Sequence, residues 1–412
     1  PYLRTMILEK AEGNPFFIEE VVRMLVDRKL IEEQDGRWLA RDQIADLEVP
    51  GSLQGLLASR VDSLDAATRA IAMVASVIGR DFEAELLSAV LDDGDQPVRT
   101  RTALSDLESH GVVKLIATRP RIAYRFRHAL LHDVVYSSIL RRRRRELHHD
   151  VATAIEATYT DSLDELSPVL ARHYVEAGEP EPALAHTIRA AETALKRHAT
   201  KGAYQFYRQG LQLIERHSDP TSTRTRLELS IGVAKAGIRF TPGDESLERL
   251  GELRRIAEDL GDDDLTGEVY SLILTVRTMG SEWYQDEGFR EVMDKAFALA
   301  PSIEDRGLAA SLTGLMGQIL RGADRYLEAA ELMSEAVEPL EYAGRLADAA
   351  MNAMMTADVL GQHGDFAEAH RWIARGSDLA HRSGNPTAIA DSNLIKGRLL
   401  ATQGDVKEAL VH

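Results

Sequence analysis

Cysteine is absent from this sequence of 412 residues, and so are long apolar runs. Without cysteine the chain forms no disulfide, no thiolate metal site and no cysteine nucleophile. No stretch approaches the roughly 20 apolar residues that cross a bilayer, and the N-terminus lacks the basic start and apolar core of a secretory signal. We therefore expect a cytoplasmic protein with no membrane partner.

Basic residues are also fewer than acidic ones: the sequence has 49 basic and 66 acidic residues, which gives a net charge of −17. This balance argues against the chain as a whole coating nucleic acid. The hydrophobic content of 44% is typical of globular proteins, and the length predicts two or three domains. Because the first residue is Pro1 and a helical pattern runs on to His412, we expect an internal segment of a longer polypeptide.

The N-terminal 64 residues contain a helix start at Gly13-Asn14-Pro15. Gly13 breaks the preceding helix, Asn14 can cap the next one, and Pro15 fits its first turn. Such a tripeptide is, by itself, a common helix signal. A hairpin is predicted over residues 30–39, with its turn at 35–36. The expected buried face of the helix consists of Phe17, Val21, Met24 and Leu25.

Residues 66–127 predict three helices followed by a hairpin, which is the outline of a winged helix. A winged helix can place its third helix in a DNA groove. Here Arg99 and Arg101 on that helix are balanced by Asp106 and Glu108, so its exposed face is mixed. The expected helices are 66–78, 82–91 and 98–110, and the expected strands are 112–116 and 122–126.

The strongest basic feature is the run Arg141 to Arg145, within a segment of thirty residues (121–150) that holds eight arginines against three acidic residues. Five consecutive arginines point to all sides of a helix and cannot form one stripe. They indicate a solvated helix paired with the chain's surplus acids. A nucleic-acid surface and a partner surface are the two alternatives.

His128 lies between the last predicted strand and the next helix, so its ring could face an anion bound nearby. His128 and His132 are spaced i, i+4 and, with Asp133, suggest a metal hydrolase as an alternative. No third ligand and no general base are evident in the sequence. A structural histidine is the ordinary interpretation, and we assign neither a metal site nor a catalytic residue.

From about residue 166 onward the apolar residues keep helical spacing, and near the C-terminus they repeat with a period of 40. Each unit predicts two antiparallel helices in which small residues allow close approach, and glycines such as Gly364 and Gly404 turn the chain. The units resemble tetratricopeptide repeats (TPRs). The corresponding positions are Leu315, Met355 and Ile395; Gly317, Ala357 and Gly397; Leu320, Leu360 and Leu400; Tyr326, Phe366 and Val406; and Ala329, Ala369 and Ala409.

The run GNPFFIEEVVRML, with Trp38 and the segments 49–53 and 58–64, resembles the passage from lid to winged helix in STAND-type signalling ATPases. The likeness extends to ATPase and repeat regions of bacterial nucleotide cyclase-like proteins and to large LuxR-type regulators. In that family the Gly-x-Pro of the lid packs against the nucleotide, which implies that Gly13 and Pro15 contact it. Residues 124–136 resemble the family's Met-His-Asp stretch, whose histidine meets the β-phosphate of ADP and corresponds to His128; Ala129 stands where many relatives have Asp.

The resemblance implies a mainly α protein in three parts: a remnant of the ATPase lid with a linker helix (1–64), a winged-helix domain with a hairpin wing (65–160), and a TPR-like superhelix (161–412). The sequence has no phosphate-binding loop and no strand ending in paired acids, so we expect no ATP hydrolysis by this chain. ATP or ADP would be held mainly by an N-terminal ATPase domain of the parent protein. The repeats would bind a protein, a peptide or a small inducer. The alternative is a DNA-binding regulator with a repeat sensor.

Overall fold

The computed structural model describes residues 5, 7, 8, 11, 13–27, 30–34, 37–40, 52–91, 97–217, 223–278, 287–405 and 409. Helices dominate this part of the chain, which confirms the mainly α prediction. The chain divides into two compact units, Pro1–His186 and Thr187–His412, each of which is described by itself. The three-part division after residues 64 and 160 stays a prediction.

Unit 1 contains the predicted Gly-Asn-Pro helix start. The Asn14 side chain accepts a hydrogen bond from the Phe16 backbone N–H at 3.0 Å, and α2 (Pro15–Asp27) follows. Its apolar face is buried as expected, with Val21 and Leu25 fully enclosed. Strands β1 (Ile31–Gln34) and β2 (Arg37–Ala40) form the predicted antiparallel hairpin, whose turn residues 35–36 lie outside the described residues, as do 49–51 of the resemblance.

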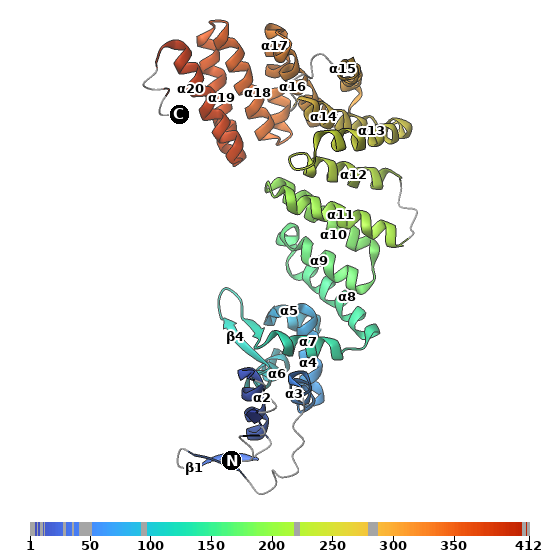
Figure 1. The fold of residues 1–412 in the computed structure, drawn as a ribbon, viewed down its shortest axis with the longest axis vertical. Helices are drawn as coiled ribbons and strands as arrows, with labels where there is room; N and C mark the ends of the chain where they lie inside the picture. Colours follow the sequence, from blue (N-terminus) through green and yellow to red (C-terminus); the bar gives the residue numbers. More distant parts are fainter. Residues whose placement is uncertain are drawn as a thin grey trace. The chain divides into compact units, whose positions relative to one another are not determined.

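Helices and a three-stranded sheet make up the middle of unit 1 (Figure 1), where β4 lies at one edge of the sheet and contacts α6, and β3 lies at the other edge and contacts α5. The predicted helices and strands are confirmed within a few residues. Leu107 and Phe126 are fully buried where α6 and β5 contribute to the core. The elements are α3 (Leu53–Asp62), α4 (Ala66–Ile78), β3 (Asp81–Glu83), α5 (Ala84–Val90), α6 (Pro97–Ser109), β4 (Val113–Ala117) and β5 (Ala123–Phe126).

One element of this sheet was predicted wrongly. The sequence places Phe82 at the start of a helix, whereas the structure places it in the short strand β3, paired with Tyr124 of β5. A bidentate ion pair joins Arg125 of β5 to Asp81 of β3, with contacts of 2.6 and 2.5 Å. Three residues are too few to show a strand period, so only pairing with β5 reveals β3.

Helices continue through the rest of unit 1. α7 (Ala129–Ser138) follows the hairpin, α8 (Arg141–Thr158) contains the arginine run, and α9 (Leu163–Ala177) ends at Gly178. α10 (Pro180–Lys196) contains the boundary between the two units.

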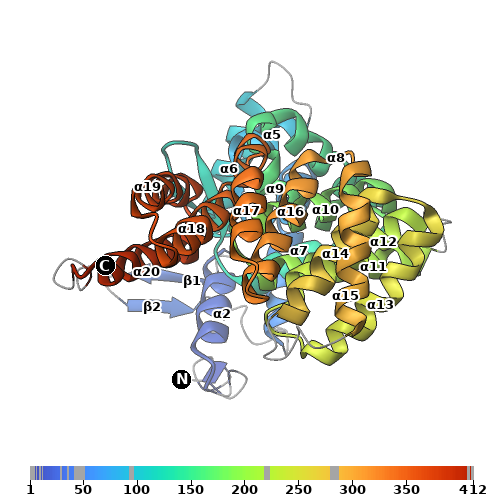
Figure 2. The same cartoon turned by 90° about the horizontal axis from the view of Figure 1, so that it is seen from above.

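In the described residues of unit 2, every regular element is a helix. Helices α16 to α20 lie side by side in both Figure 1 and Figure 2, and consecutive members pack against each other. The two-helix units of 40 residues are therefore confirmed. The remaining helices are α11 (Thr200–His217), α12 (Thr223–Gly237), α13 (Gly243–Leu260), α14 (Asp263–Thr278), α15 (Glu287–Leu299), α16 (Arg306–Gly322), α17 (Tyr326–Tyr342), α18 (Leu346–Gln362), α19 (Phe366–Ser383) and α20 (Pro386–Gln403).

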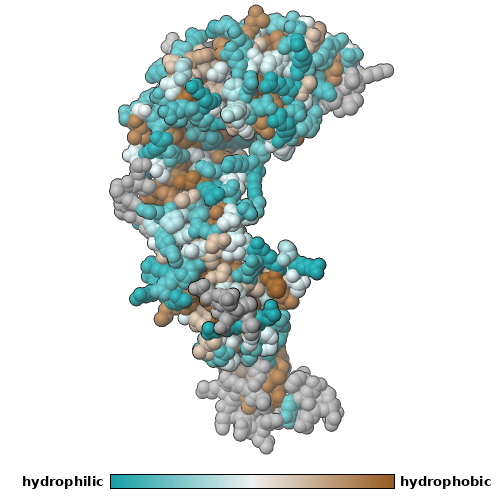
Figure 3. Space-filling view, turned by 180° about the vertical axis from the view of Figure 1, so that it is seen from behind, coloured by the Kyte–Doolittle hydropathy of each residue, from teal (hydrophilic) through white to brown (hydrophobic). Residues whose placement is uncertain are grey.

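Close approach of helices within a repeat depends on small residues, as predicted. A Cβ atom at Gly317 of α16 would lie 2.9 Å from the carbonyl oxygen of Ala329 in α17 and 2.6 Å from Cγ of Met333. Ala357 and Ala369 are fully buried at the corresponding places of the next repeat. The upper part of Figure 3 shows mainly hydrophilic side chains on the outward face of these helices. Among the described residues no helix combines the length and the apolarity needed to cross a membrane.

Candidate functional site

His128 occupies the position directly before α7, where it is the N-cap residue with extended backbone angles. Its side chain makes no capping hydrogen bond and is half-buried. Instead the ring lies against Phe16 of α2, with the two ring centroids 3.9 Å apart. The tertiary fold thus brings the start of the N-terminal helix against the histidine that follows the hairpin.

Gly13 and Pro15 lie at this same helix start. Both residues are exposed, and Pro15 directly precedes the Phe16 that contacts His128. Gly13 has a φ of +82°, a left-handed conformation that favours glycine, and the next backbone N–H, that of Asn14, bonds to the carbonyl of Ala11 at 2.7 Å. The three residues predicted from the sequence to contact a nucleotide are therefore associated with one region of unit 1.

A buried ion pair anchors α2 to α3 beside this contact. Nη2 of Arg60 lies 2.9 Å from Oε2 of Glu20, and the two side chains are 6% and 2% exposed. Burial raises the pKa of Glu20, while the charges of Arg60 and Arg23 oppose this shift. Removing one partner of a buried pair leaves an uncompensated charge, so a substitution of Glu20 or Arg60 alone is expected to destabilise the contact between α2 and α3.

Cationic side chains surround His128. Burial is the largest cause of its lowered pKa, the carboxylate of Glu19 opposes the shift, and Arg60, Arg127 and Arg23 lower the pKa further. Nε of Arg127 is buried and has no hydrogen-bond partner among the described residues. A neutral imidazole among guanidinium groups is an environment that a bound anion would complement.

His132 does not share the environment of His128. Its Nδ1 lies 2.9 Å from a carboxylate oxygen of Asp133, and its Nε2 lies 2.9 Å from the backbone carbonyl oxygen of Ser76. Both ring nitrogens are thus engaged by protein groups. The part of the chain that the structure describes contains no group of three potential metal ligands.

The arginine run lies at the start of α8, where several members have local partners. Arg142 and Arg143 both bond to Glu146, at 3.2 and 3.1 Å, and the guanidinium of Arg144 lies 4.9 Å from the centroid of the Tyr136 ring. These contacts match the interpretation of a solvated helix with paired arginines.

Sequence reasoning missed several residues of the site, namely Phe16, Arg23, Arg127 and the Glu20–Arg60 pair. Arg60 lies inside the stretch that carries the family resemblance, but nothing local in the sequence assigns it a buried partner. Arg23 reaches the turn at Gly111, where a Cβ atom would lie 2.1 Å from its Nη1. Such contacts join segments far apart in the chain, so no short motif could have revealed them.

Comparison with known proteins gives one family match and one curated relative. A family described as a domain of unknown function, DUF8739, matches residues 1–38. The uncharacterized protein R02095 of Rhizobium meliloti (strain 1021) is 30% identical over 207 residues. That alignment covers 50% of this chain and 19% of the relative, so the chain matches about a fifth of the relative's length.

Two of the solved structures with partial likeness are a signal transduction ATPase and a Rap protein. A signal transduction ATPase with numerous domains and a tetratricopeptide repeat sensor, from Pyrococcus horikoshii, aligns with a TM-score of 0.43 and 11% identity, covering 96% of this chain and 59% of that one. A Rap protein complexed with competence and sporulation factor aligns with a TM-score of 0.46 and 12% identity, covering 86% and 85%. TM-scores this low transfer no function, so the function is argued from the geometry.

Proposed function

We propose that this chain is the regulatory part of a STAND-type signalling ATPase. In this proposal α2 and its Gly13-Asn14-Pro15 start belong to the ATPase lid, α4 to β5 form a winged helix, and the helices of unit 2 form a sensor that binds a ligand or a protein. ATP or ADP is held mainly by an ATPase domain of the parent protein. The chain itself does not hydrolyse ATP.

The observation that carries the proposal is the contact between the rings of Phe16 and His128 at 3.9 Å. Two motifs that the family resemblance assigns to one nucleotide are separated by more than a hundred residues of sequence, yet they lie together. This juxtaposition supports a shared role at a ligand that bridges the lid and the winged helix.

The electrostatics around His128 support an anionic group of that ligand. Arg23, Arg60 and Arg127 each disfavour protonation of the ring. A phosphate group would offset their charges and allow the imidazolium to form, which strengthens the hydrogen bond to the anion. His128 and Arg127 are therefore the residues proposed to hold the phosphate, and Pro15 the residue proposed to contact the base.

The test uses the full-length parent protein, in which the ATPase domain is present. His128→Ala should increase the ADP dissociation rate by about tenfold, corresponding to the roughly 1.5 kcal/mol or more of a hydrogen bond to a charged group, and it should raise basal signalling output.

The matched control is His149→Ala, because His149 is an exposed histidine of α8 that bonds to Glu179 away from this site. The control should release ADP at the unaltered rate. Equal ADP dissociation from the His128 variant and from the parent protein would contradict the proposal.

A further inference from the structure

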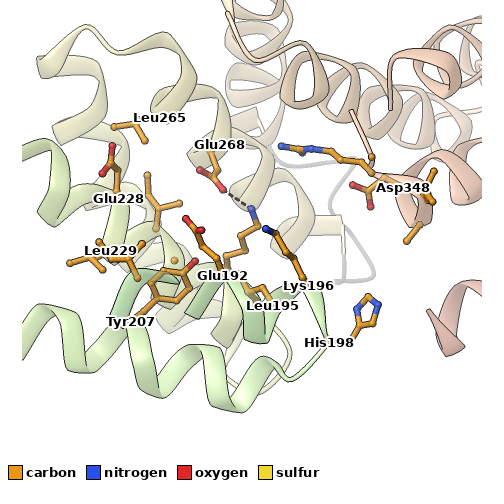
Figure 4. Close-up of a pocket in the computed structure, with 18 of the residues that line it drawn as sticks. Glu192, Leu195, Lys196, His198, Tyr207, Glu228, Leu229, Leu265, Glu268 and Asp348 are labelled. Carbon is orange, nitrogen blue, oxygen red and sulfur yellow. Dashed lines mark hydrogen bonds and ion pairs between the residues drawn. The ribbon is translucent and has the colours of Figure 1, made fainter. Parts of the chain in front are cut away.

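Unit 2 contains a hollow of about 850 Å³ that lies within the size range of small-molecule sites, about 300–1,000 Å³. It is lined by residues of α10, α11, α12 and α14 on one side and by the segment 344–348 that leads into α18 on the other. In Figure 4 Glu192 and Lys196 extend from α10 toward Glu268, and Asp348 lies across the hollow.

Charges of both signs line the hollow, and only some of them are paired within the protein. Nζ of Lys235 lies 2.7 Å from a carboxylate oxygen of Glu268. Glu192 and Lys196 are four residues apart on α10, the spacing of a helical ion pair, yet neither forms an ion pair with any described residue. One ammonium and one carboxylate are thus available to a ligand on this side.

Asp348 provides a second available carboxylate. Its side chain opens to the hollow, and its one side-chain hydrogen bond among the described residues comes from Ser311 at 3.5 Å. Asp348 is an exposed residue, so its carboxylate is accessible to a ligand in the hollow. A cationic group of a ligand would stabilise this carboxylate.

Tyr207 adds a hydroxyl group to the wall. The residue as a whole is 8% exposed, and it lines the hollow. Gly232 allows this placement, because a Cβ atom there would lie 2.5 Å from the Tyr207 ring. Burial, helped by Glu192 and Glu268, raises the pKa of Tyr207 to about 12, so the hydroxyl remains a donor at neutral pH.

His198 lines the hollow in a strained backbone conformation. Its φ is +58°, in the left-handed region, where the ends of α13 and α19 have Gly261 and Gly384 instead. Non-glycine residues in this region are uncommon, although histidine is among those enriched there, and Asp324 in the turn after α16 has the same conformation. Because the His198 side chain is exposed and lines the hollow, it is accessible to a ligand.

Apolar side chains complete the lining. Leu195, Leu229 and Leu265 face the hollow between the charged groups. They provide a surface for an apolar side chain of the ligand.

We propose that this hollow binds a small zwitterion of the free amino acid and short peptide class, with its carboxylate at Lys196 and its ammonium at Asp348. The Tyr207 hydroxyl donates a hydrogen bond to the ligand, and the leucines contact its apolar side chain. A purely anionic ligand would meet the carboxylates of Glu192 and Asp348, and a purely cationic one would meet Lys196. The inference rests on the proposed sensor role of the repeats and names the ligand class.

The first experiment titrates the 412-residue chain with three probes by calorimetry: free leucine, an Ala-Leu-Ala peptide with free termini, and the same peptide acetylated and amidated. We expect binding of at least one probe with free charges, and at least tenfold weaker binding of the doubly capped peptide. Free leucine binding alone supports an amino acid, and peptide binding alone supports a peptide. Equal binding of capped and free peptides, or no binding at millimolar concentration, would overturn the proposal.

Variants test which residue binds the carboxylate of the ligand and which binds its ammonium group. Lys196→Met should make binding insensitive to amidation of the C-terminus, and Asp348→Asn should make it insensitive to acetylation of the N-terminus. Tyr207→Phe should weaken binding severalfold without changing either sensitivity. Lys201→Met is the control, because Lys201 lies on α11 outside the hollow and should have no effect.

His198→Gly separates a binding role from a structural one. Glycine relieves the left-handed strain, so the Tm of the ligand-free variant should rise, while its affinity for the ligand should fall. A variant with a higher Tm and unchanged affinity would remove His198 from the site. No nucleotide takes part in these titrations, so a failure here with a normal His128→Ala effect on ADP would overturn the ligand assignment alone.

Discussion

At the scale of single residues, buried histidines connect α7, α8 and α9 in unit 1. The Tyr136 hydroxyl lies 2.9 Å from Nε2 of His148, whose Nδ1 lies 2.9 Å from Nδ1 of His173. Burial is the largest cause that lowers the pKa of His148 to about 4 and that of His173 to about 3, and nearby positive charge, including Arg172, lowers both further. Both rings are therefore neutral in the folded protein at neutral pH.

This network predicts a loss of stability in mild acid. Below the unfolded pKa of about 6.5 the unfolded chain takes up protons that folded His148 and His173 do not accept. Their contribution is therefore fully present above pH 6.5 and decreases as the pH falls toward 4. The free energy of unfolding should decrease by up to about 1.4 kcal/mol per pH unit for each histidine, measured by urea unfolding between pH 7.5 and 5.

Between pH 6 and 5, His173→Gln should reduce the slope of the free energy of unfolding against pH by about 1.4 kcal/mol per pH unit, which is the contribution of one proton. Above pH 7 the variant and the original chain should show the same slope, which serves as the internal control. An unchanged slope between pH 6 and 5 would show that His173 is not responsible.

At the scale of elements, α16 and α17 approach each other closely at Gly317, which has no side chain. Gly317→Ala should place a methyl group against the backbone of α17, because only 2.9 Å separates the added Cβ from the Ala329 carbonyl oxygen. We expect a net loss of about 1–2 kcal/mol, since overpacking exceeds the gain in helix propensity. Urea unfolding followed by circular dichroism measures the change.

Gly251→Ala provides the matched control in α13. Nothing lies within 4 Å of a Cβ atom at this position. Only the higher helix propensity of alanine therefore affects the stability, and the variant should be more stable by about 0.5–1 kcal/mol. If Gly317→Ala were also more stable than the original chain, α16 and α17 would be able to move apart at little cost in free energy.

Ion pairs between repeats form a second kind of contact at this scale. The carboxylate of Asp358 in α18 lies 3.1 Å from Nη1 of Arg321 in α16 and 2.9 Å from Nη2 of Arg398 in α20. Arg398 stands 40 residues after Asp358, at the corresponding position of the next repeat. Asp358 and Arg398 thus join adjacent repeats through opposite charges at equivalent positions. The period of the apolar residues does not reveal this ion pair.

At the scale of the whole molecule, the net charge of −17 argues against a general affinity for nucleic acid. The arginine run of α8 is partly neutralised by Glu146, and the long-range field of the chain is negative. We expect no binding to a mixed DNA duplex of 30 base pairs at 50 mM salt, measured by fluorescence anisotropy. Binding that weakens steeply with added salt would instead support the DNA-binding alternative.

The parts of the fold that local sequence predicted are those with many local contacts. The Asn14 cap, the helix predicted over 98–110 and the helices of the 40-residue repeats all depend on hydrogen bonds and packing within a few turns of helix. By contrast β3 was missed, because its three residues form a strand only by pairing with β5. For the candidate site the sequence suggested Gly13, Pro15 and His128, whereas Phe16 and Arg127 became apparent from their contacts.

Composition and residue spacing predicted the helical character of the chain and its repeat period. The sequence also excluded thiol chemistry. The lack of thiols follows from composition, whereas the helical character and the repeat period follow from spacing along a helix. The folded chain was needed to reveal three contacts: Phe16 lies against His128, Glu20 is buried against Arg60, and Tyr207 lines a charged hollow with Lys196. The physical reason is that each of these contacts joins separate elements, so its existence depends on how the helices pack and not on any local preference of the residues involved.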